Sequence, residues 1–269
     1  MSYHTHIHHQ RPLWTFLAAS GLATALLALP LMVVAWRGLS VGFAYYLTNP
    51  TVIAAITLSL STSLTSVIVT LLLGTPLAYT LARWRFRYKA AIELVVDLPI
   101  VLPPLVAGIG LLLTFGRNGT LGPVLDALGI RLPFTTAAVI VAMTFVSAPL
   151  FIRATRLGFA AIQPEIMEAA YVDGATERQL FWHIMLPLAS RAMLNGLILA
   201  WARAFGEFGA TIVFAGNLEG STQTMPLAIF IGFETDLGIA LGLALVLMLL
   251  SAVVLLILRR LESHPDLTV

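Results

Sequence analysis

Three polar residues are spaced four apart within an otherwise apolar stretch of the chain. Arg203, Glu207 and Thr211 occupy positions i, i+4 and i+8, so a continuous helix would place them on one face. Arginine and glutamate at this spacing can form an ion pair. A charge near the centre of a membrane costs about 3 kcal/mol, so this face is expected to point inward. The pair could tie helices together or line a polar path, and the residues favour neither alternative.

A second stretch is unusually rich in proline. Residues 97–108 contain Pro99, Pro103 and Pro104 and end in Gly108. Because proline lacks an N–H and its ring clashes with the preceding turn, a helix must kink or break here. In hydrocarbon the freed carbonyl groups find no partner, so such breaks are tolerated where they pack on protein or line a cavity. We expect this segment to lie beside a polar path rather than only to bend a helix.

The elements that position these residues are expected to be membrane helices. Of the 269 residues, 59% are hydrophobic and 10% are charged, whereas ordinary soluble domains have about 25% charged residues. About 20 apolar residues cross the hydrocarbon core. Five runs without charge and one that is apolar except for Arg203 and Glu207 are suitable: residues 12–36, 38–82, 98–116, 132–152, 237–258 and 194–215. The predicted fold class is all-α, a polytopic membrane protein with six transmembrane helices.

Two of these runs need interpretation. The first run is longer than the apolar core of a signal peptide, so we keep it as a true span. The second run is too long for one helix and is broken early by Asn49-Pro50, so its helix is expected over about residues 51–82.

The basic residues predict the orientation of the six spans, because lysine and arginine stay preferentially on the cytoplasmic side. With the N-terminus inside, three arginines are external, namely Arg37, Arg117 and Arg131. Eleven basic residues are then cytoplasmic: Arg11, Arg83, Arg85, Arg87, Lys89, Arg153, Arg156, Arg178, Arg191, Arg259 and Arg260. Both termini are therefore expected in the cytoplasm. The predicted organisation is a tail of residues 1–12, a six-helix domain 13–258 with a long cytoplasmic loop 153–193, and a tail 259–269.

Several function classes are disfavoured by composition. The net charge of +2 and the single lysine, Lys89, argue against nucleic-acid binding. The absence of cysteine excludes thiol chemistry and disulfides. The chain lacks a G-x-x-x-x-G-K-[ST] phosphate loop, so it is not itself an ATPase. No metal-ligand or catalytic set is evident, and the N-terminal histidines are taken as part of a solvated tail.

The long cytoplasmic loop predicts two short helices. Pro164 suits the first turn of one helix, and Gly174 is a plausible stop. Thr176 can cap a second helix that runs towards residue 186, where Pro187 would stop or kink it.

The loop also carries a specific motif, E-A-A-x3-G-x9-I-x-L-P, which resembles the signature loop of ABC importer permeases. Its positions are Glu168, Ala169, Ala170, Gly174, Ile184, Leu186 and Pro187. The resemblance implies that this loop supplies a coupling helix that docks on a separate ATPase subunit. It also implies a homodimeric membrane subunit in a prokaryotic inner membrane, with two ATPase copies and an extracytoplasmic binding protein. ATP and Mg²⁺ would be bound by the ATPase, with no cofactor on this chain.

Further segments are similar to molybdate-type permeases: residues 98–104, 115–119, 206–211, 216–217 and 222–227. Sulfate/thiosulfate and tungstate permeases remain alternatives, since they share much of this pattern. The resemblance implies import of a tetrahedral oxyanion, with a translocation pathway expected near Pro99, Pro103, Pro104, Arg203, Glu207 and Thr211. Hydroxyl residues between Ser59 and Ser66 could serve an anion, but close helix packing is the favoured interpretation. An ATP-independent secondary transporter is the alternative from another class, although the acidic relays and inverted repeats it predicts are not evident.

Overall fold

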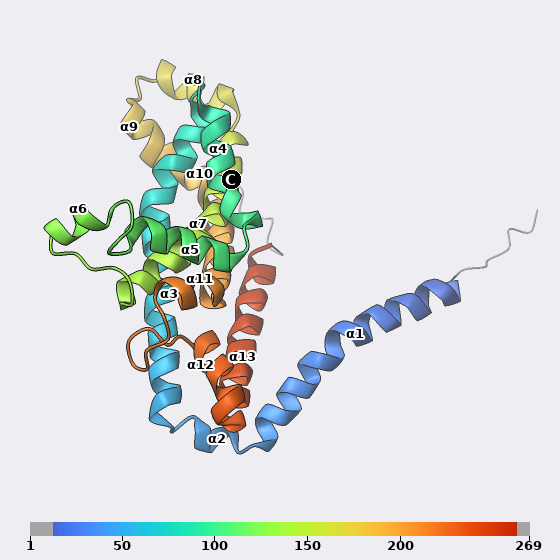
Figure 1. Ribbon diagram of the computed structural model, residues 1–269. Coiled ribbons are helices and arrows are strands. Elements are labelled where there is room, and N and C mark those ends of the chain that lie inside the picture. The colour runs from blue at the N-terminus through green and yellow to red at the C-terminus, as the bar shows by residue number, and fades with distance from the viewer. Residues whose placement is uncertain (1–12, 263–269) are drawn as a thin grey trace, which may run out of the picture.

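The computed structural model describes residues 13–262, and every regular element within them is a helix (Figure 1). The predicted tail 1–12, with its histidines, lies outside the described residues, as does most of the tail 259–269. The helices are α1 (Leu13–Ser40), α2 (Phe43–Tyr46), α3 (Pro50–Arg83), α4 (Lys89–Val101), α5 (Pro104–Phe115), α6 (Gly122–Ala127), α7 (Thr136–Ala160), α8 (Pro164–Val172), α9 (Glu177–Leu180), α10 (Leu186–Phe205), α11 (Gly209–Phe214), α12 (Met225–Thr235) and α13 (Leu237–Glu262). A π-helical segment, Phe181–Met185, joins α9 to α10.

Five helices in the described part of the chain are long and apolar enough to cross a membrane. They are α1, α3, α7, α13 and the continuous run from α9 through the π-helical segment to the end of α10. The all-α polytopic class is thereby confirmed. Four of the six expected spans are single helices, and the other two are interrupted.

The expected span 98–116 is divided between α4 and α5. Leu102 has extended backbone angles, φ −67° and ψ 130°, and Pro103 is similar at φ −54° and ψ 131°. Each of these residues precedes a proline, which disfavours helical angles at that position. Pro99 lies inside α4 and does not end it, so the break comes from the Pro103-Pro104 pair.

The expected span 194–215 is also interrupted. Helix α10 ends at Phe205, and the six-residue helix α11 begins only at Gly209. Arg203, Glu207 and Thr211 therefore do not share one continuous helical face, contrary to the expectation from their spacing.

Residues 216–236, which the six-span interpretation left as a connection, contain a further apolar helix, α12. Its first amide, of Met225, donates a hydrogen bond of 2.7 Å to Ser59 Oγ on α3. This short helix escaped the sequence analysis because its 11 residues are fewer than a membrane span requires.

Small residues bring α3 close to α7. Thr62, Ser66, Thr70, Gly74 and Ala78 follow at four-residue intervals along α3, and all five are buried. A β-carbon on Gly74 would lie 2.8 Å from Phe151 Cδ1, so the two helices meet at a separation that only glycine permits. This arrangement supports the packing interpretation of the hydroxyl residues, since side chains without bulk let backbones approach.

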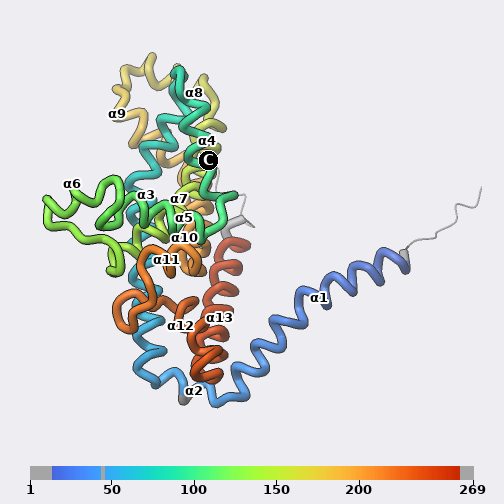
Figure 2. The backbone as a smooth tube through the Cα atoms, viewed as in Figure 1, coloured from blue at the N-terminus to red at the C-terminus, as the bar shows by residue number. Residues whose placement is uncertain are grey.

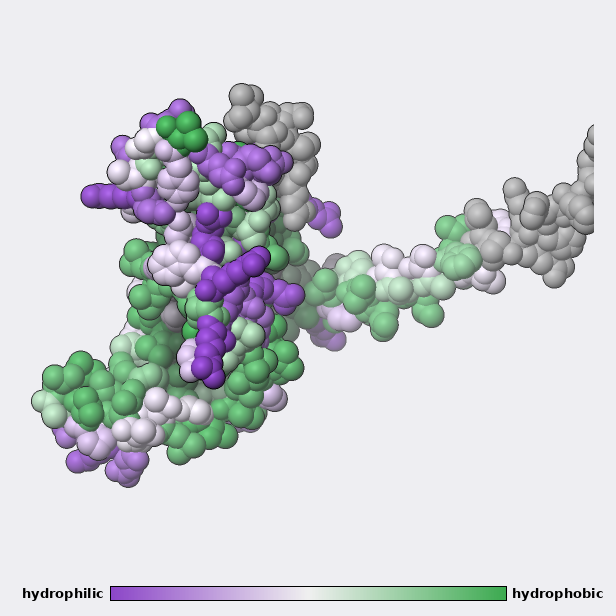
Figure 3. Space-filling model, turned by 90° about the horizontal axis from the view of Figure 1, so that it is seen from above, coloured by the Kyte–Doolittle hydropathy of each residue, from purple (hydrophilic) through white to green (hydrophobic). Residues whose placement is uncertain are grey.

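Helix α1 extends away from the rest of the described chain (Figures 1 and 2). None of its most apolar 18-residue window is buried, and its side chains form a largely hydrophobic arm in Figure 3. Its C-terminal end is held at Gly38, where a β-carbon would lie 3.0 Å from Leu245 Cβ on α13. The long apolar surface of α1 therefore suits contact with lipid or another protein chain.

Candidate functional site

The two helix breaks lie against each other. A β-carbon on Gly209, at the start of α11, would lie 2.8 Å from Pro104 Cβ and 3.2 Å from the amide nitrogen of Leu105. One turn further along α5, a β-carbon on Gly108 would lie 2.9 Å from the carbonyl oxygen of Ala210. The junction thus joins segments about a hundred positions apart, and two glycines permit the close approach of their backbones.

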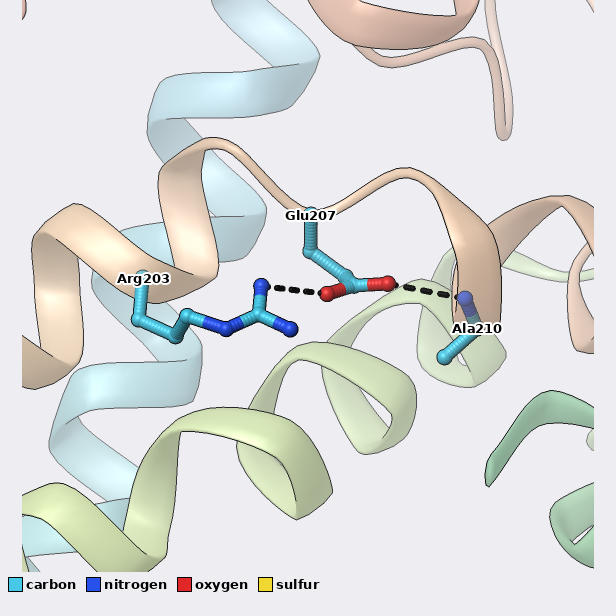
Figure 4. A network of polar contacts seen from close by, with 3 residues as sticks. All are labelled: Arg203, Glu207 and Ala210. Carbon is cyan, nitrogen blue, oxygen red and sulfur yellow. Dashed lines mark hydrogen bonds and ion pairs between the residues drawn. The ribbon is translucent and has the colours of Figure 1, made fainter. Parts of the chain in front are cut away.

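An ion pair spans the break between α10 and α11 (Figure 4). Arg203 Nη1 donates to Glu207 Oε2 at 2.5 Å, while Glu207 Oε1 accepts the N–H of Ala210 at 2.8 Å. The Glu207 side chain is only 1% exposed, and these two hydrogen bonds satisfy both of its oxygens inside the protein. The second bond pairs an otherwise free donor in the first turn of α11, as capping side chains do.

Arg203 is less enclosed than its partner, with its side chain 33% exposed. The expected ion pair is therefore present, but it bridges an irregular segment instead of lying along one helix. Thr211 is fully buried in α11, and its hydroxyl has no hydrogen-bond partner among residues 13–262. The sequence spacing missed the amide of Ala210, because a backbone donor becomes available only where a helix starts.

The first predicted loop helix is α8, with Pro164 in its first turn as expected. Gly174 has a φ of +82°, its amide donates to the carbonyl of Tyr171 at 3.0 Å, and the amide of Ala175 donates to that of Ala170 at 2.9 Å. These two bonds and the left-handed glycine form a Schellman termination. The predicted helix start and stop are confirmed.

The second loop helix, α9, begins with a capping box. Thr176 Oγ1 accepts the amide of Gln179 at 3.3 Å, and Gln179 Oε1 accepts the amide of Thr176 at 2.9 Å. Tyr171 links the two loop helices by donating its hydroxyl to Glu177 Oε1 at 2.7 Å. This hydrogen bond is the main reason that the pKa of Tyr171 is raised.

Of the two outcomes predicted for Pro187, a stop or a kink, the stop does not occur, because the helix continues past this residue. The π-helical segment precedes it, and the amide of Leu186 donates to the carbonyl of Phe181, five residues back. A proline ring clashes with the carbonyl four residues before it, and the wider π turn is a way of avoiding this clash within a continuous helix. The helix therefore runs on through Pro187 into the bundle.

The seven motif residues divide into exposed and packed positions. Glu168, Ala169 and Gly174 are exposed on the loop, whereas Ala170 is buried against the bundle. Pro187 is exposed at the start of α10. Ile184 and Leu186 are partly buried and pack on the hydrophobic cluster that includes Phe151, Phe159 and Met185. The structure thus presents one part of the motif at the surface and uses another part to attach the loop. Within residues 13–262, no three His, Asp or Glu side chains come together as a possible metal site.

The sequence matches the family model described as the inner membrane component of binding-protein-dependent transport systems, over residues 74–265. The chain belongs to this family. It is a permease subunit of an ABC transporter, a multi-pass membrane protein and not an enzyme, as expected from the loop motif.

Relatives of this permease cover most of its length. It is 38% identical over 245 residues to the molybdenum transport system permease protein ModB of Mycobacterium tuberculosis, which covers 91% of this chain and 92% of ModB. It is 42% identical over 208 residues to the probable transport system permease protein NifC of Clostridium pasteurianum, covering 77% of this chain and 73% of NifC. Identity to the sulfate transport system permease protein CysT of Salmonella typhimurium is 34% over 243 residues, covering 89% and 88% of the two chains.

Solved structures support the fold of the permease. A chain of a bacterial alginate ABC transporter, in complex with an alginate pentasaccharide-bound periplasmic protein, matches with a TM-score of 0.74. The match covers 95% of both chains at 18% identity, a level that informs on fold alone.

Proposed function

We propose that this permease imports a tetrahedral oxyanion, with molybdate as its main substrate. The observation that carries the proposal is the 38% identity to a molybdenum permease along more than nine-tenths of both chains. The 34% identity to CysT makes sulfate, and with it thiosulfate, the principal alternative. Tungstate is the other candidate, because it has the same shape and charge as molybdate.

The proposed assembly contains two copies of this chain, two ATPase subunits and an extracytoplasmic binding protein, in the inner membrane of a prokaryote. A second copy or lipid would cover the apolar surface of α1. Both termini and the loop 153–193 lie in the cytoplasm in this proposal, and the membrane domain comprises residues 13–258. ATP and Mg²⁺ are bound by the ATPase, and nucleic acid is not a partner.

The proposed ATPase contact is the motif-bearing loop. The exposed residues Glu168, Ala169 and Gly174 would meet the partner. Ala170, Ile184 and Leu186 would join this contact to the bundle, and Pro187 would lie exposed beside them at the start of α10. Because the second loop helix continues through the π-helical segment into α10, a movement of the loop would be transmitted along one helical run to the α10–α11 break.

The proposed translocation pathway passes the junction of the two helix breaks. Its residues are Pro99, Pro103, Pro104, Arg203, Glu207 and Thr211. Irregular backbone at membrane depth is tolerated where it packs on protein or lines a cavity, which favours this location. Closure of the ATPases on ATP would rock the loops and open the path outward, and hydrolysis would restore the inward-facing state.

The decisive experiment reconstitutes the permease with its ATPase and binding protein in proteoliposomes. ATP hydrolysis and oxyanion uptake are measured with the binding protein loaded in turn with molybdate, tungstate, sulfate and thiosulfate. We expect ATP-dependent uptake, with molybdate giving the largest stimulation of hydrolysis. Larger uptake and stimulation of hydrolysis with sulfate would show that sulfate, not molybdate, is the main substrate. Uptake without the ATPase would instead support an ATP-independent transporter and contradict the proposal.

A further inference from the structure

The last turns of α10 present a charged group on an open surface. Ala202 and Gly206 are exposed, and the Arg203 side chain beside them is one-third exposed. These residues belong to a run that is apolar apart from Arg203 and Glu207. A guanidinium that faced lipid at this depth would be strongly disfavoured. The open side of Arg203 therefore faces an aqueous path or a protein surface.

The hydrogen bonds of the ion pair are distributed unequally. Both carboxylate oxygens of Glu207 are used, one by Arg203 and one by the amide of Ala210. Arg203 spends only Nη1 on this contact, and no other hydrogen bond or ion pair of its side chain is formed within residues 13–262. A guanidinium has five N–H donors, so most of those on Arg203 remain available. Glu207 is thus fully hydrogen-bonded, whereas Arg203 is held at Nη1 and keeps N–H donors for a further ligand.

Spare guanidinium donors fit a tetrahedral oxyanion. Arginine recognises such ions through paired N–H groups, as it does phosphate. A lone arginine in a low-dielectric site would bind a dianion too tightly for rapid release, whereas transport requires binding strong enough to admit the ion and weak enough to release it. The neighbouring carboxylate lowers the net charge of the pair to zero and so weakens the hold on the anion.

We propose that Arg203 is the residue that contacts the oxyanion within the pathway, and that Glu207 is a positioning residue that orients Arg203 and limits its affinity for the anion. This inference rests on the proposed function and adds a division of roles within the pair. The alternative is an ion pair that only stabilises the α10–α11 break.

Neutralising both members of the pair separates these alternatives. In the variant R203Q/E207Q, two amides can keep a hydrogen bond across the break without leaving a buried charge unpaired. We expect its thermal stability to exceed that of R203Q, in which Glu207 remains buried and alone. Oxyanion uptake by the double variant should nevertheless stay about tenfold or more below that of the native assembly, the size of effect given by one lost charge-assisted hydrogen bond.

The measurement uses the full transporter in proteoliposomes and compares molybdate uptake with ATP hydrolysis. R259Q removes an exposed arginine from the last turn of α13 and serves as the matched control. Native uptake tests the proposed function, while the ratio of variant to native uptake tests this inference. Native-level uptake by R203Q/E207Q would overturn the contact role of Arg203 and leave the pair a structural one, even if the importer function holds.

A second variant keeps the inference testable if the double variant does not fold. R203H retains a group whose charge is lost at moderately alkaline pH. Relative to the native assembly, its uptake should fall between about pH 6 and pH 9. Its melting temperature, measured over the same range, is the control for a structural effect. Uptake that stays constant across this range, or that falls only in step with the melting temperature, would count against an anion contact.

Discussion

Single residues in the cytoplasmic loop act through backbone geometry as much as through side-chain chemistry. Gly174 has a left-handed φ of +82°, yet a β-carbon there would meet nothing within 4 Å. The constraint at this position is therefore conformational, worth about 1–2 kcal/mol for an ordinary residue. Asparagine tolerates the left-handed region better than most residues, whereas aspartate adds a negative charge at the carboxyl end of α8.

These properties give a matched pair of substitutions. We expect Gly174→Asn to retain most coupling, while Gly174→Asp inserts into the membrane normally but hydrolyses ATP with little uptake. The two side chains differ little in size, so the comparison isolates charge at the proposed ATPase contact. Membrane content, uptake and hydrolysis are measured for both variants. Normal uptake by Gly174→Asp would contradict a docking role for this turn.

Helices in this permease pack closely because small residues line their contacts. The α3–α7 contact depends on Gly74, whose neighbours are Phe151 and Ile152. On α5, by contrast, a β-carbon on Gly110 would have no neighbour within 4 Å. Glycine-to-valine substitution has a similar effect on intrinsic helix propensity at both positions. A difference in stability between the two variants therefore reports the packing at Gly74.

Gly74→Val should destabilise the purified permease by about 1–3 kcal/mol, the usual effect of overpacking. Gly110→Val should change the stability of the permease much less than Gly74→Val does, because a β-carbon at Gly110 meets no neighbour. The measurement is thermal unfolding in detergent, followed by the loss of helical circular dichroism. Equal melting temperatures for the two variants would show that the α3–α7 separation is not set by Gly74.

At the scale of the whole molecule, the proposed orientation in the membrane rests on the distribution of basic residues. The proposed topology places Asn118 outside and Gln163 inside, and both side chains are exposed. The chain contains no cysteine, so single-cysteine variants need no prior removal of native thiols.

Asn118→Cys should react with a membrane-impermeant maleimide in intact spheroplasts, where the external face is accessible. Gln163→Cys should react only after the membrane is permeabilised. The native chain is the unlabelled control. The reverse pattern would place the termini outside and would also remove the loop from the side on which an ATPase binds.

The sequence by itself determined the membrane class, four uninterrupted spans, the start and stop of α8 and the cap of α9. These features depend on local information: runs of apolar residues, the φ restriction of proline, the freedom of glycine and side chains that reach nearby amides. The spacing of Arg203 and Glu207 allowed an ion pair, but it did not decide that the two side chains touch. The resemblance in the loop motif led to the correct family for the same reason, since the motif is a local pattern.

Only the tertiary structure decided how the broken helices are used. The contact of Pro104 with Gly209 joins distant segments, and no local pattern specifies which segments meet. The break after Phe205 places the amide of Ala210 beside Glu207. The ion pair of Arg203 and Glu207 therefore connects α10 to α11 across an irregular turn and does not lie along one helix. Pro187 was expected to stop or kink its helix, and the structure decided between the two: a π turn accommodates the proline, with Met185 buried and Leu186 packed on the core. Long-range packing outweighed local preference at each of these positions.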